Sequence, residues 1–431
     1  MNRSIRERIA FAHFSLVHRC PPFIIRQWQT TQLRRLLQHT FLYVPMWRDI
    51  FSGTRVSKGQ IRELGDLAAI PLTSKDTYIG RMVEEYIDNG HRFTPRWNST
   101  SGTSGKPFRS LLSSQYIEDT SYAGFALFRF LLWNGGHFGD IASTKIAHIK
   151  QKTYSSPFRL GLNYTDFLKD QKNAYLQLAE FKPEVLMAYP SVLFDIARMM
   201  ETDTTLPMLT PRYISSSGEI LTPQVRSFVS EQLGAEVYNR YALEEIGVVG
   251  TECNRHNGFH VNSESIIIEI TDESGKPLPE GEHGKVIVTD LLNYNMPFIR
   301  YDTGDRGSIS FAPCACGLYT PRLWLKSRSS AYLTFGNRRI YRHEFIVLDE
   351  LMHSVFQYQV VKHGENELLL RIVPGPTWKE TIVEEIKKNL LSLFGGGIRI
   401  SVELVSNIPK TTRGKSNLIV DETGPASSLL S

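Results

Sequence analysis

Apolar and polar positions alternate along the chain in a way that predicts repeated strand–turn–helix units between residues 183 and 241. Segments that read as strands, at 185–188, 213–217 and 237–241, alternate there with segments that read as helices, at 192–200 and 222–233. Strands separated by helices usually pair in parallel, so the pattern favours an α/β fold. Ligands in such folds bind beyond the carboxyl ends of the strands. The polar turns that follow the strands are therefore expected to line one edge together, at residues 189–191, 215–219 and 241–245.

The pattern changes on both sides of this region. Residues 1–50 are predicted to be helical with a break at Pro21-Pro22, and a short helix is expected to begin at 73–76. Further predicted elements are strands at 92–97, 266–270, 284–289, 298–301, 331–334, 357–362, 367–373 and 398–404, and helices at 113–134, 343–353 and 377–393. We place a domain boundary at Arg328. It separates a large domain (1–327), which contains a β-rich section (261–325), from a small α/β domain (328–431).

Composition excludes several classes of protein. The chain has 431 residues, 41% of them hydrophobic and 22% charged, as expected for a globular protein with more than one domain. The formal net charge is only +5 and the basic residues are dispersed, so no nucleic-acid partner is expected. No apolar run is long enough to predict a membrane span. The N-terminal residues are charged and lack the apolar centre of a secretory signal, which predicts a cytoplasmic protein.

The stretch at 99–107 reads Ser-Thr-Ser-Gly-Thr-Ser-Gly-Lys-Pro and combines hydroxyl side chains, two glycines and a lysine. Backbone N–H groups in a glycine-rich turn form a concave anion site, to which the hydroxyls and Lys106 add donors and positive charge. These features predict a loop that holds a polyphosphate. The stretch does not fit the P-loop pattern, because its glycines are too close together and Pro107 follows the lysine. A flexible Ser/Gly linker is the alternative interpretation.

Four motifs occur in an order that resembles the adenylate-forming acyl-CoA synthetase superfamily. They are the stretch at 99–107, Tyr-Ala-Leu-Glu-Glu at 241–245, Arg-Tyr-Asp-Thr-Gly-Asp at 300–305 and Pro-Lys-Thr-Thr-Arg-Gly-Lys at 409–415. Shorter features at 189–191, 217–219 and 251–316 resemble the phenylacetate–CoA ligase and CapK-like branch. The resemblance covers residues 70–420. It implies a large adenylate-forming domain, with parallel-sheet α/β subdomains and a β-rich subdomain, and a small mobile α/β C-terminal domain.

The resemblance implies an enzyme that joins a carboxylate to AMP from ATP, releases pyrophosphate and passes the acyl group to coenzyme A. Glu245 would bind Mg²⁺, for which a carboxylate oxygen is suited; the alternative is a carboxylate that stabilises a helix start. Asp305 would accept hydrogen bonds from the ribose hydroxyls, and Lys415 would stabilise charge at the α-phosphate. The β- and γ-phosphates would be held by Ser99, Thr100, Ser101, Gly102, Thr103, Ser104, Gly105 and Lys106.

The remaining nucleotide contacts follow from the same resemblance. Tyr241 would lie against the adenine, or alternatively pack as a core aromatic. Ser217, Gly218 and Glu219 would contact the base or the wall of its pocket. Arg328 fits the arginine at the domain hinge, although its neighbours differ from the usual pattern. Glu244 stands where the family more often has Thr or Ser, which weakens the expected phosphate contact at that position.

The acid pocket is expected to be lined by aromatic side chains and suited to an aryl or hydrophobic acid. By position in the family, the lining residues would be Trp133, His137, Phe138, Tyr189 and Tyr238. A packed core would use the same residue types, so core packing is the alternative.

The cysteines indicate a candidate metal site separate from the nucleotide site. Cys314 and Cys316 are separated by one residue, and Cys253 precedes them in the chain. Three thiolates and one imidazole suit a tetrahedral structural Zn²⁺ site, and some members of the resembled branch carry one here. His260 is the preferred fourth ligand and His256 the alternative. Reduced cysteines without a metal are the other interpretation, and Cys20 stands apart as a small apolar residue.

The sequence therefore predicts an AMP-forming carboxylate ligase whose partners are ATP, a small-molecule carboxylic acid and coenzyme A. Transfer of the acyl group to an amine or a carrier-protein thiol is one alternative, because nothing in residues 326–431 specifies a coenzyme A pocket. A non-catalytic nucleotide-binding relative is the other, and the presence of Glu245 and Lys415 argues against it. The sequence specifies neither the acid nor the pathway, and a homodimer is one candidate assembly.

Overall fold

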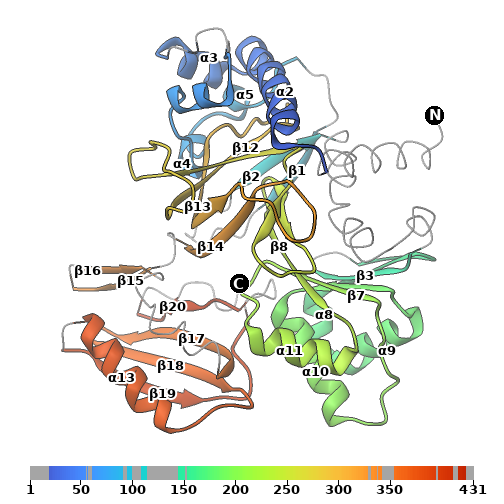
Figure 1. Cartoon of the computed structure of the whole chain (residues 1–431). Helices are drawn as coiled ribbons and strands as arrows, with labels where there is room; N and C mark the ends of the chain where they lie inside the picture. Colours follow the sequence, from blue (N-terminus) through green and yellow to red (C-terminus); the bar gives the residue numbers. More distant parts are fainter. Residues whose placement is uncertain are drawn as a thin grey trace. The chain divides into compact units, whose positions relative to one another are not determined.

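The structure is a computed structural model that describes residues 19–54, 56, 61–90, 95–99, 108–113, 144–150, 153–328, 332–336, 338–341, 354–394, 397–410 and 416–423. The chain forms two compact units, residues 1–141 with 240–327 and residues 142–239 with 328–431 (Figure 1). Three predicted elements lie outside the described residues: the loop at 100–106, the helix at 113–134 from residue 114 onward, and the helix at 343–353.

The first unit combines short helices with an antiparallel sheet. Its helical elements are α2 (Pro22–Tyr43), α3 (Pro45–Ser52), the 3-10 helix η2 (Leu64–Ala69), α4 (Lys75–Tyr78) and α5 (Val83–Tyr86). Its strands are β9 (Gly247–Glu252), β10 (Phe259–Val261), β11 (Ile266–Thr271), β12 (Gly284–Asp290), β13 (Tyr301–Ser310) and β14 (Arg322–Arg328), in the order β11-β12-β13-β14-β10-β9, with a separate hairpin of β1 (Pro95–Ser99) and β2 (Arg109–Ser113). Strand β8 (Val237–Leu243) pairs with β9 from residue 240 onward. The β-rich pattern after residue 261 is thereby confirmed.

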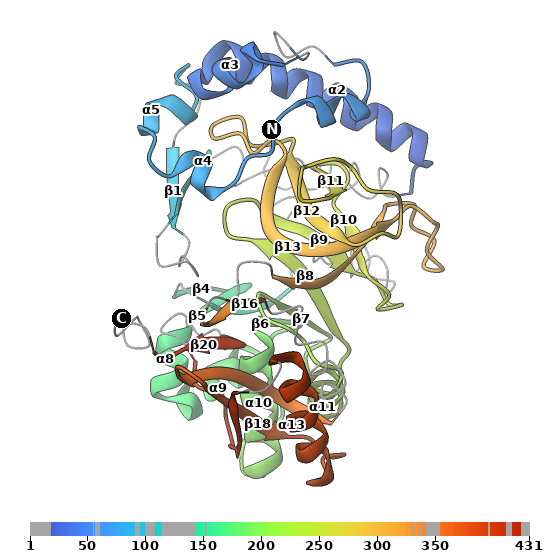
Figure 2. The same cartoon turned by 90° about the vertical axis from the view of Figure 1, so that its left-hand side faces the viewer.

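Helices α2 and α3 lie across the β11–β13 strands, as Figure 2 shows from the side. Leu33, Leu36 and Leu37 of α2 are fully buried, in agreement with the helical spacing of apolar residues. Two hydrogen bonds fix the position of α2, because the Gln29 side-chain amide donates to the carbonyls of Ser263 (2.9 Å) and Ile266 (3.0 Å). Helix α2 begins at Pro22, where the sequence predicts a break, and a second interruption falls at Val44 between α2 and α3.

One predicted strand is wrong. Residues 298–301 were expected to form a strand, but β13 begins at Tyr301 and continues to Ser310. Arg300 has a φ of 45°, in the left-handed region, which an extended strand cannot include. The strand therefore begins after the turn at Arg300 and passes through the Asp-Thr-Gly-Asp motif.

The second unit contains a mainly parallel sheet. The strands β3 (Ile146–Lys150), β4 (Tyr154–Ser156), β5 (Arg159–Asn163), β6 (Val185–Ala188) and β7 (Tyr213–Ser217) follow the order β7-β6-β3-β5-β4. Its helices are α8 (Tyr164–Lys169), α9 (Gln171–Phe181), α10 (Pro190–Thr202) and α11 (Pro223–Leu233). The pairs β3–β5, β3–β6 and β6–β7 are parallel, so the predicted α/β arrangement is confirmed.

Local sequence explains where these helices begin and end. Pro190 occupies the first turn of α10, where a missing N–H is tolerated. Thr222 caps α11 by accepting from the Val225 amide, and Gly234 ends that helix with a φ of 63°. Each helix therefore begins just beyond the carboxyl end of a parallel strand, which brings the turns after β6 and β7 to one edge.

The C-terminal part of the second unit has its own sheet and helix. Strands β17 (Val355–Gly364), β18 (Glu367–Pro374), β19 (Arg399–Leu404) and β20 (Ile419–Asp421) follow the order β19-β18-β17-β20, next to α13 (Thr381–Phe394) and a separate hairpin of β15 (Tyr332–Phe335) and β16 (Arg338–Tyr341). Ile386 and Leu390 of α13 pack on this sheet, within one cluster of buried residues. The predicted strands and helix of this part are confirmed, apart from the helix at 343–353.

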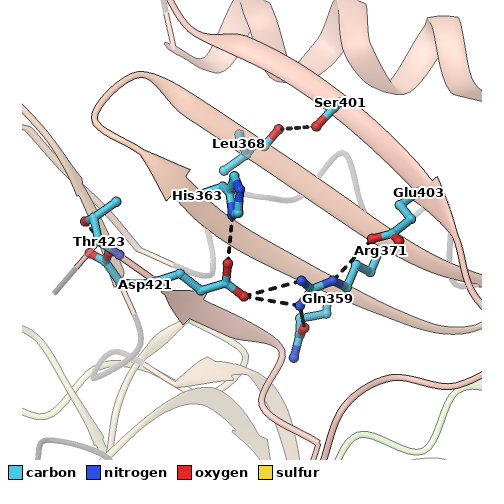
Figure 3. A network of polar contacts seen from close by, with 9 residues as sticks. Gln359, His363, Leu368, Arg371, Ser401, Glu403, Asp421 and Thr423 are labelled. Carbon is cyan, nitrogen blue, oxygen red and sulfur yellow. Dashed lines mark hydrogen bonds and ion pairs between the residues drawn. The ribbon is translucent and has the colours of Figure 1, made fainter. Parts of the chain in front are cut away.

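A polar network holds the last strand in place (Figure 3). The guanidinium of Arg371 on β18 donates to Gln359 (3.0 Å), Glu422 (3.3 Å) and Glu403 (3.4 Å). Glu422 also contacts Nδ1 of His363 at 2.8 Å. Since Glu422 follows β20 directly, the network ties the end of the chain to the three strands β17, β18 and β19.

Candidate functional site

Glu245 lies in the turn between β8 and β9 and is almost completely buried. The Tyr301 hydroxyl donates to its Oε1 at 2.6 Å, and the ammonium of Lys75 lies 3.7 Å from the same oxygen. No helix begins at this position, so the alternative of a helix-start carboxylate is wrong. A buried carboxylate held by a neutral donor and one cation is a chemically suitable Mg²⁺ ligand.

Lys75 is a residue that the sequence did not connect with this site. It was expected only as part of a helix start, and it does open α4 after the cap residue Ser74. The tertiary fold brings it to Glu245, because Thr73 bridges to Tyr301 and its amide donates to the Arg300 carbonyl at 2.9 Å. No local pattern around Lys75 indicates a partner so far along the chain.

Asp305 and Tyr241 are brought together in the first unit. The Tyr241 hydroxyl donates to Oδ2 of Asp305 at 2.7 Å, and both side chains are buried. The Asp305 amide donates to the Thr303 hydroxyl at 3.0 Å, and Gly304 takes a φ of 73°. A left-handed residue at Gly304 therefore turns the strand so that Asp305 faces Tyr241. The nucleotide roles predicted for this pair stay predictions.

Arg300 opens the Arg-Tyr-Asp-Thr-Gly-Asp motif and has a structural role. Its side chain is 2% exposed and donates to Glu269 (3.1 Å), the Ile70 carbonyl (2.6 Å) and the Gly275 carbonyl (2.7 Å). Burial raises the pKa of Glu269, and the neighbouring Arg300 opposes that rise. The guanidinium therefore joins three separate segments of the first unit behind the motif.

In the second unit, the predicted turn residues 217–219 follow β7 directly. Ser217 is buried and Gly218 has a φ of 85°. The Glu219 carboxylate accepts from the Ser191 amide at 3.0 Å and from the Ser191 hydroxyl at 3.1 Å. The turns after β6 and β7 therefore meet at one edge, as the pattern predicts. Contact of these residues with a base stays a prediction.

Tyr189 and Tyr238, predicted to line the acid pocket, are both about 1% exposed. Tyr189 packs against Tyr164 with ring centroids 6.3 Å apart, and Tyr238 donates its hydroxyl to Glu236. The other predicted site residues lie outside the described side chains: Ser99, Thr100, Ser101, Gly102, Thr103, Ser104, Gly105, Lys106, Trp133, His137, Phe138, Arg328 and Lys415. The structure therefore describes the aromatic environment of only two of the five pocket residues.

The side chains of Cys253, His260, Cys314 and Cys316 converge in the first unit, with ligand atoms all within 4.8 Å of one another. The Sγ atoms of Cys253 and Cys314 are 3.9 Å apart, and Nε2 of His260 lies 3.3 Å from Sγ of Cys316. Tetrahedral Zn²⁺ with bonds of about 2.3 Å to sulfur places its thiolates about 3.8 Å apart, so the donor set and spacing fit. Nδ1 of His260 contacts the Thr320 hydroxyl at 2.9 Å, which leaves Nε2 directed at the thiols.

The alternative ligand His256 lies elsewhere. Its Nδ1 contacts Glu252 at 3.1 Å, and its φ of 48° is in the left-handed region. His260, on β10, therefore completes the group of four, and His256 does not belong to it.

Among the described helices, none has the length and apolar content to cross a membrane.

Known proteins match the chain over most of its length. Residues 339–422 match the CapK C-terminal domain family. The chain is 26% identical to a phenylacetate–coenzyme A ligase of Thermus thermophilus over 80% of this chain and 79% of the relative. It is 23% identical to a phenylacetate–coenzyme A ligase of Aromatoleum evansii, over 92% and 94% of the two chains. These matches support the adenylate-forming superfamily, in its phenylacetate–CoA ligase and CapK-like branch.

The fold agrees with that likeness. A solved structure of 2-hydroxyisobutyryl-CoA ligase in complex with an acyl-AMP superposes with a TM-score of 0.72, at 18% identity, over 94% of this chain and 91% of the other. At that identity the likeness concerns the fold alone. The mixed α/β fold and the resemblance drawn from the four motifs are both confirmed.

Proposed function

We propose that the protein activates a carboxylic acid with ATP as an acyl adenylate and then transfers the acyl group to coenzyme A. The observation that carries this proposal is the relationship to phenylacetate–coenzyme A ligases over nearly the whole chain. The described part of the first unit adds a buried carboxylate at Glu245 and the joined pair Tyr241–Asp305, in the motifs where the superfamily places its nucleotide contacts.

The proposed reaction has two steps. A carboxylate oxygen of the acid attacks the α-phosphorus of ATP, the bond to the β-phosphate oxygen breaks, and pyrophosphate leaves. The sulfur of coenzyme A then attacks the acyl carbon, the bond to the AMP oxygen breaks, and the thiol loses its proton. The acid needs the first step because its own oxygen is a poor leaving group, whereas AMP is a good one.

The chain's residues have distinct proposed roles in these steps. Asp305 accepts hydrogen bonds from the ribose, and Tyr241 both orients Asp305 and lies beside the base. Lys415 neutralises charge that develops at the α-phosphate. Glu245 is the residue that would hold Mg²⁺, and a bound Mg²⁺ would supply charge neutralisation for the pyrophosphate leaving group. Tyr301 fixes the orientation of Glu245, because its hydroxyl donates to the carboxylate.

The proposal also includes the class of acid that the enzyme activates. The relatives named for phenylacetate and the aromatic residues predicted around the pocket favour an aryl or hydrophobic acid. We therefore expect pyrophosphate release, in the presence of ATP and Mg²⁺, to be stimulated by aryl acids more than by amino acids across a panel of aryl, fatty and amino acids.

The same assay distinguishes the alternatives. Thioester formation that depends on coenzyme A supports the proposed acceptor. Pyrophosphate release without a thioester would instead favour an amine or a carrier-protein thiol as acceptor. If no acid stimulates release while ATP still binds, the protein is a non-catalytic relative and the proposed function is wrong.

We also propose that Cys253, His260, Cys314 and Cys316 bind a structural Zn²⁺. All four are donors that zinc prefers, and three of them are buried, which suits a closed site without an open position. The cluster connects the turn after β9, strand β10 and the segment between β13 and β14. A metal there would stabilise that part of the first unit, since metal binding energy becomes folding energy.

Elemental analysis of the purified protein should find about one zinc per chain, as a single tetrahedral site requires. Cys316→Ser should lose most of that zinc and melt several degrees lower, because a serine hydroxyl is a poor zinc ligand. Cys20→Ser is the matched control, since Cys20 lies outside the cluster and should leave zinc content unchanged. A wild-type protein without metal would show that the zinc assignment is wrong.

A further inference from the structure

Lys75 and Glu245 form an ion pair within the first unit. The Nζ atom of Lys75 lies 3.7 Å from Oε1 of Glu245, and the two side chains are 34% and 4% exposed. The Tyr301 hydroxyl donates to the same oxygen at 2.6 Å. Among the residues that the structure describes, Lys75 is the only cation paired with this carboxylate. A buried carboxylate is unfavourable without a compensating charge, and Lys75 supplies that charge to Glu245.

The main chain at Lys75 is held firmly beside the start of β13. Thr73, two residues earlier, donates its amide to the Arg300 carbonyl at 2.9 Å, and its carbonyl accepts from the Asp302 amide at 2.7 Å. Helix α4 then begins at Lys75. The base of the Lys75 side chain is therefore fixed relative to the strand that carries Tyr301, and the fold itself brings this lysine to Glu245.

The ammonium of Lys75 is held less firmly than its main chain. A separation of 3.7 Å is longer than a hydrogen bond, so the contact with Glu245 is electrostatic. The side chain is partly exposed and ends in a flexible four-carbon stem. Tyr301, in contrast, is fully buried and makes a short hydrogen bond to the carboxylate. A cation that binds Glu245 can therefore displace the ammonium into water while the Tyr301 contact stays.

We propose that the Lys75 ammonium is an internal counter-ion of Glu245 that competes with Mg²⁺ for this carboxylate. The inference rests on the proposed function for the role of Glu245 as the Mg²⁺ ligand. Two cations that share one carboxylate repel each other, and the repulsion is strong where one side of the site is buried. Lys75 acts through Glu245 and is therefore a positioning residue, which needs no contact with the reacting atoms.

This competition makes metal binding depend on the nucleotide. A free Mg²⁺ ion gains one protein carboxylate at Glu245 and loses the ion pair with Lys75, so its affinity is low. Mg²⁺ in proteins is commonly held by one or two carboxylates together with the phosphates of a substrate. A nucleotide supplies those phosphate oxygens and offsets the loss of the ion pair. Lys75 therefore disfavours the metal alone and favours the complex of metal and nucleotide.

The test measures binding of Mn²⁺, as a paramagnetic substitute for Mg²⁺, to the full chain without nucleotide. The electron paramagnetic resonance signal of free Mn²⁺ gives the dissociation constant. Lys75→Met should bind Mn²⁺ about 10-fold more tightly than wild type, since a cation within about 4–6 Å of a carboxylate changes proton binding by at least about that factor. Lys75→Arg keeps the charge and should bind as weakly as wild type. A purely structural role of Lys75 predicts no gain of affinity.

Two further variants assign the gain to Glu245. Lys75→Gln removes the charge but can still donate a hydrogen bond to Glu245, so it should fold and bind Mn²⁺ as tightly as Lys75→Met. Adding Glu245→Gln to Lys75→Met should abolish the gain. Lys276→Met is the matched control, because Lys276 is an exposed lysine of the same unit and its loss should leave the Mn²⁺ affinity unchanged.

Thermal unfolding gives a second readout that needs no activity. In buffer without added Mg²⁺, Lys75→Met should melt below wild type, because Glu245 is then buried without a cation. Added Mg²⁺ should raise the melting temperature of Lys75→Met more than that of wild type, since a ligand that binds the native state more tightly stabilises it more.

Equal Mn²⁺ affinities of wild type, Lys75→Met and Lys75→Gln would overturn the competition, and so would a gain that survives Glu245→Gln. Pyrophosphate release with ATP and Mg²⁺ tests the proposed function separately. If the wild-type protein releases pyrophosphate but the Lys75 variants bind Mn²⁺ no better, only the counter-ion assignment fails. If no acid stimulates release and Lys75→Met still gains affinity at Glu245, the proposed function fails and the counter-ion assignment stands.

Discussion

Replacing Lys415 by alanine should slow acyl-adenylate formation by on the order of 100- to 1,000-fold, the loss typical when one group that stabilises transition-state charge is removed. The attack on the α-phosphorus builds negative charge on its oxygens, and a lysine ammonium placed there compensates it. ATP binding should persist, because the residues proposed to hold the nucleotide, the loop at 99–106, Asp305 and Tyr241, are unchanged in this variant. The measurement is single-turnover pyrophosphate release alongside a direct ATP-binding assay.

A matched control for this variant is Lys379→Ala. Lys379 is an exposed lysine of the same C-terminal part and should have no effect on either assay. Thioester formation from a supplied acyl adenylate should also continue in Lys415→Ala, since the α-phosphate chemistry is then complete. An unchanged rate of adenylate formation would refute the role assigned to Lys415. Loss of ATP binding would instead assign this lysine to the ground-state complex.

Arg300→Met should lower the free energy of unfolding by about 3–5 kcal/mol, the cost of breaking a buried ion pair by removing one partner. The substitution leaves Glu269 buried without its cation and removes the donor from the Ile70 and Gly275 carbonyls. Denaturant unfolding, followed by a probe in the first unit, measures the effect. Arg300→Lys should also be destabilised, because an ammonium cannot reproduce the fork of the guanidinium.

Arg306→Met provides the comparison on the same strand. Arg306 pairs with Glu273, but the two side chains are 27% and 70% exposed, so the pair lies largely in water. Surface ion pairs contribute about 0–1 kcal/mol, and the variant should unfold close to the wild-type midpoint. If Arg300→Met were no less stable than Arg306→Met, the structural role of Arg300 would be wrong.

The sequence predicts the strands and helices of the second unit because the signals for them lie within a few residues of each element. The buried strand β6 is a short apolar run, α10 and α11 both carry a proline in the first turn, and Thr222 caps α11. Hydrophobic period and capping chemistry act within a few residues. The prediction of a strand at 298–301 is wrong because Arg300 takes a left-handed turn. Tertiary contacts of its side chain to Glu269 and η2 accompany that turn, and no local pattern indicates them.

In the candidate site, too, some residues were predictable from the sequence and others were placed only by the tertiary structure. The sequence alone identified the superfamily, the thiol and imidazole residues and the motif carboxylates, since these depend on residue type and order. Only the tertiary structure showed that His260, and not His256, joins the cysteines, because which imidazole faces the thiols depends on the pairing of β10 with β9 and β14. Only the structure placed Lys75 beside Glu245 and Lys410 beside Asp195. Contacts between residues far apart in the chain arise from packing of whole elements, and no local pattern encodes them.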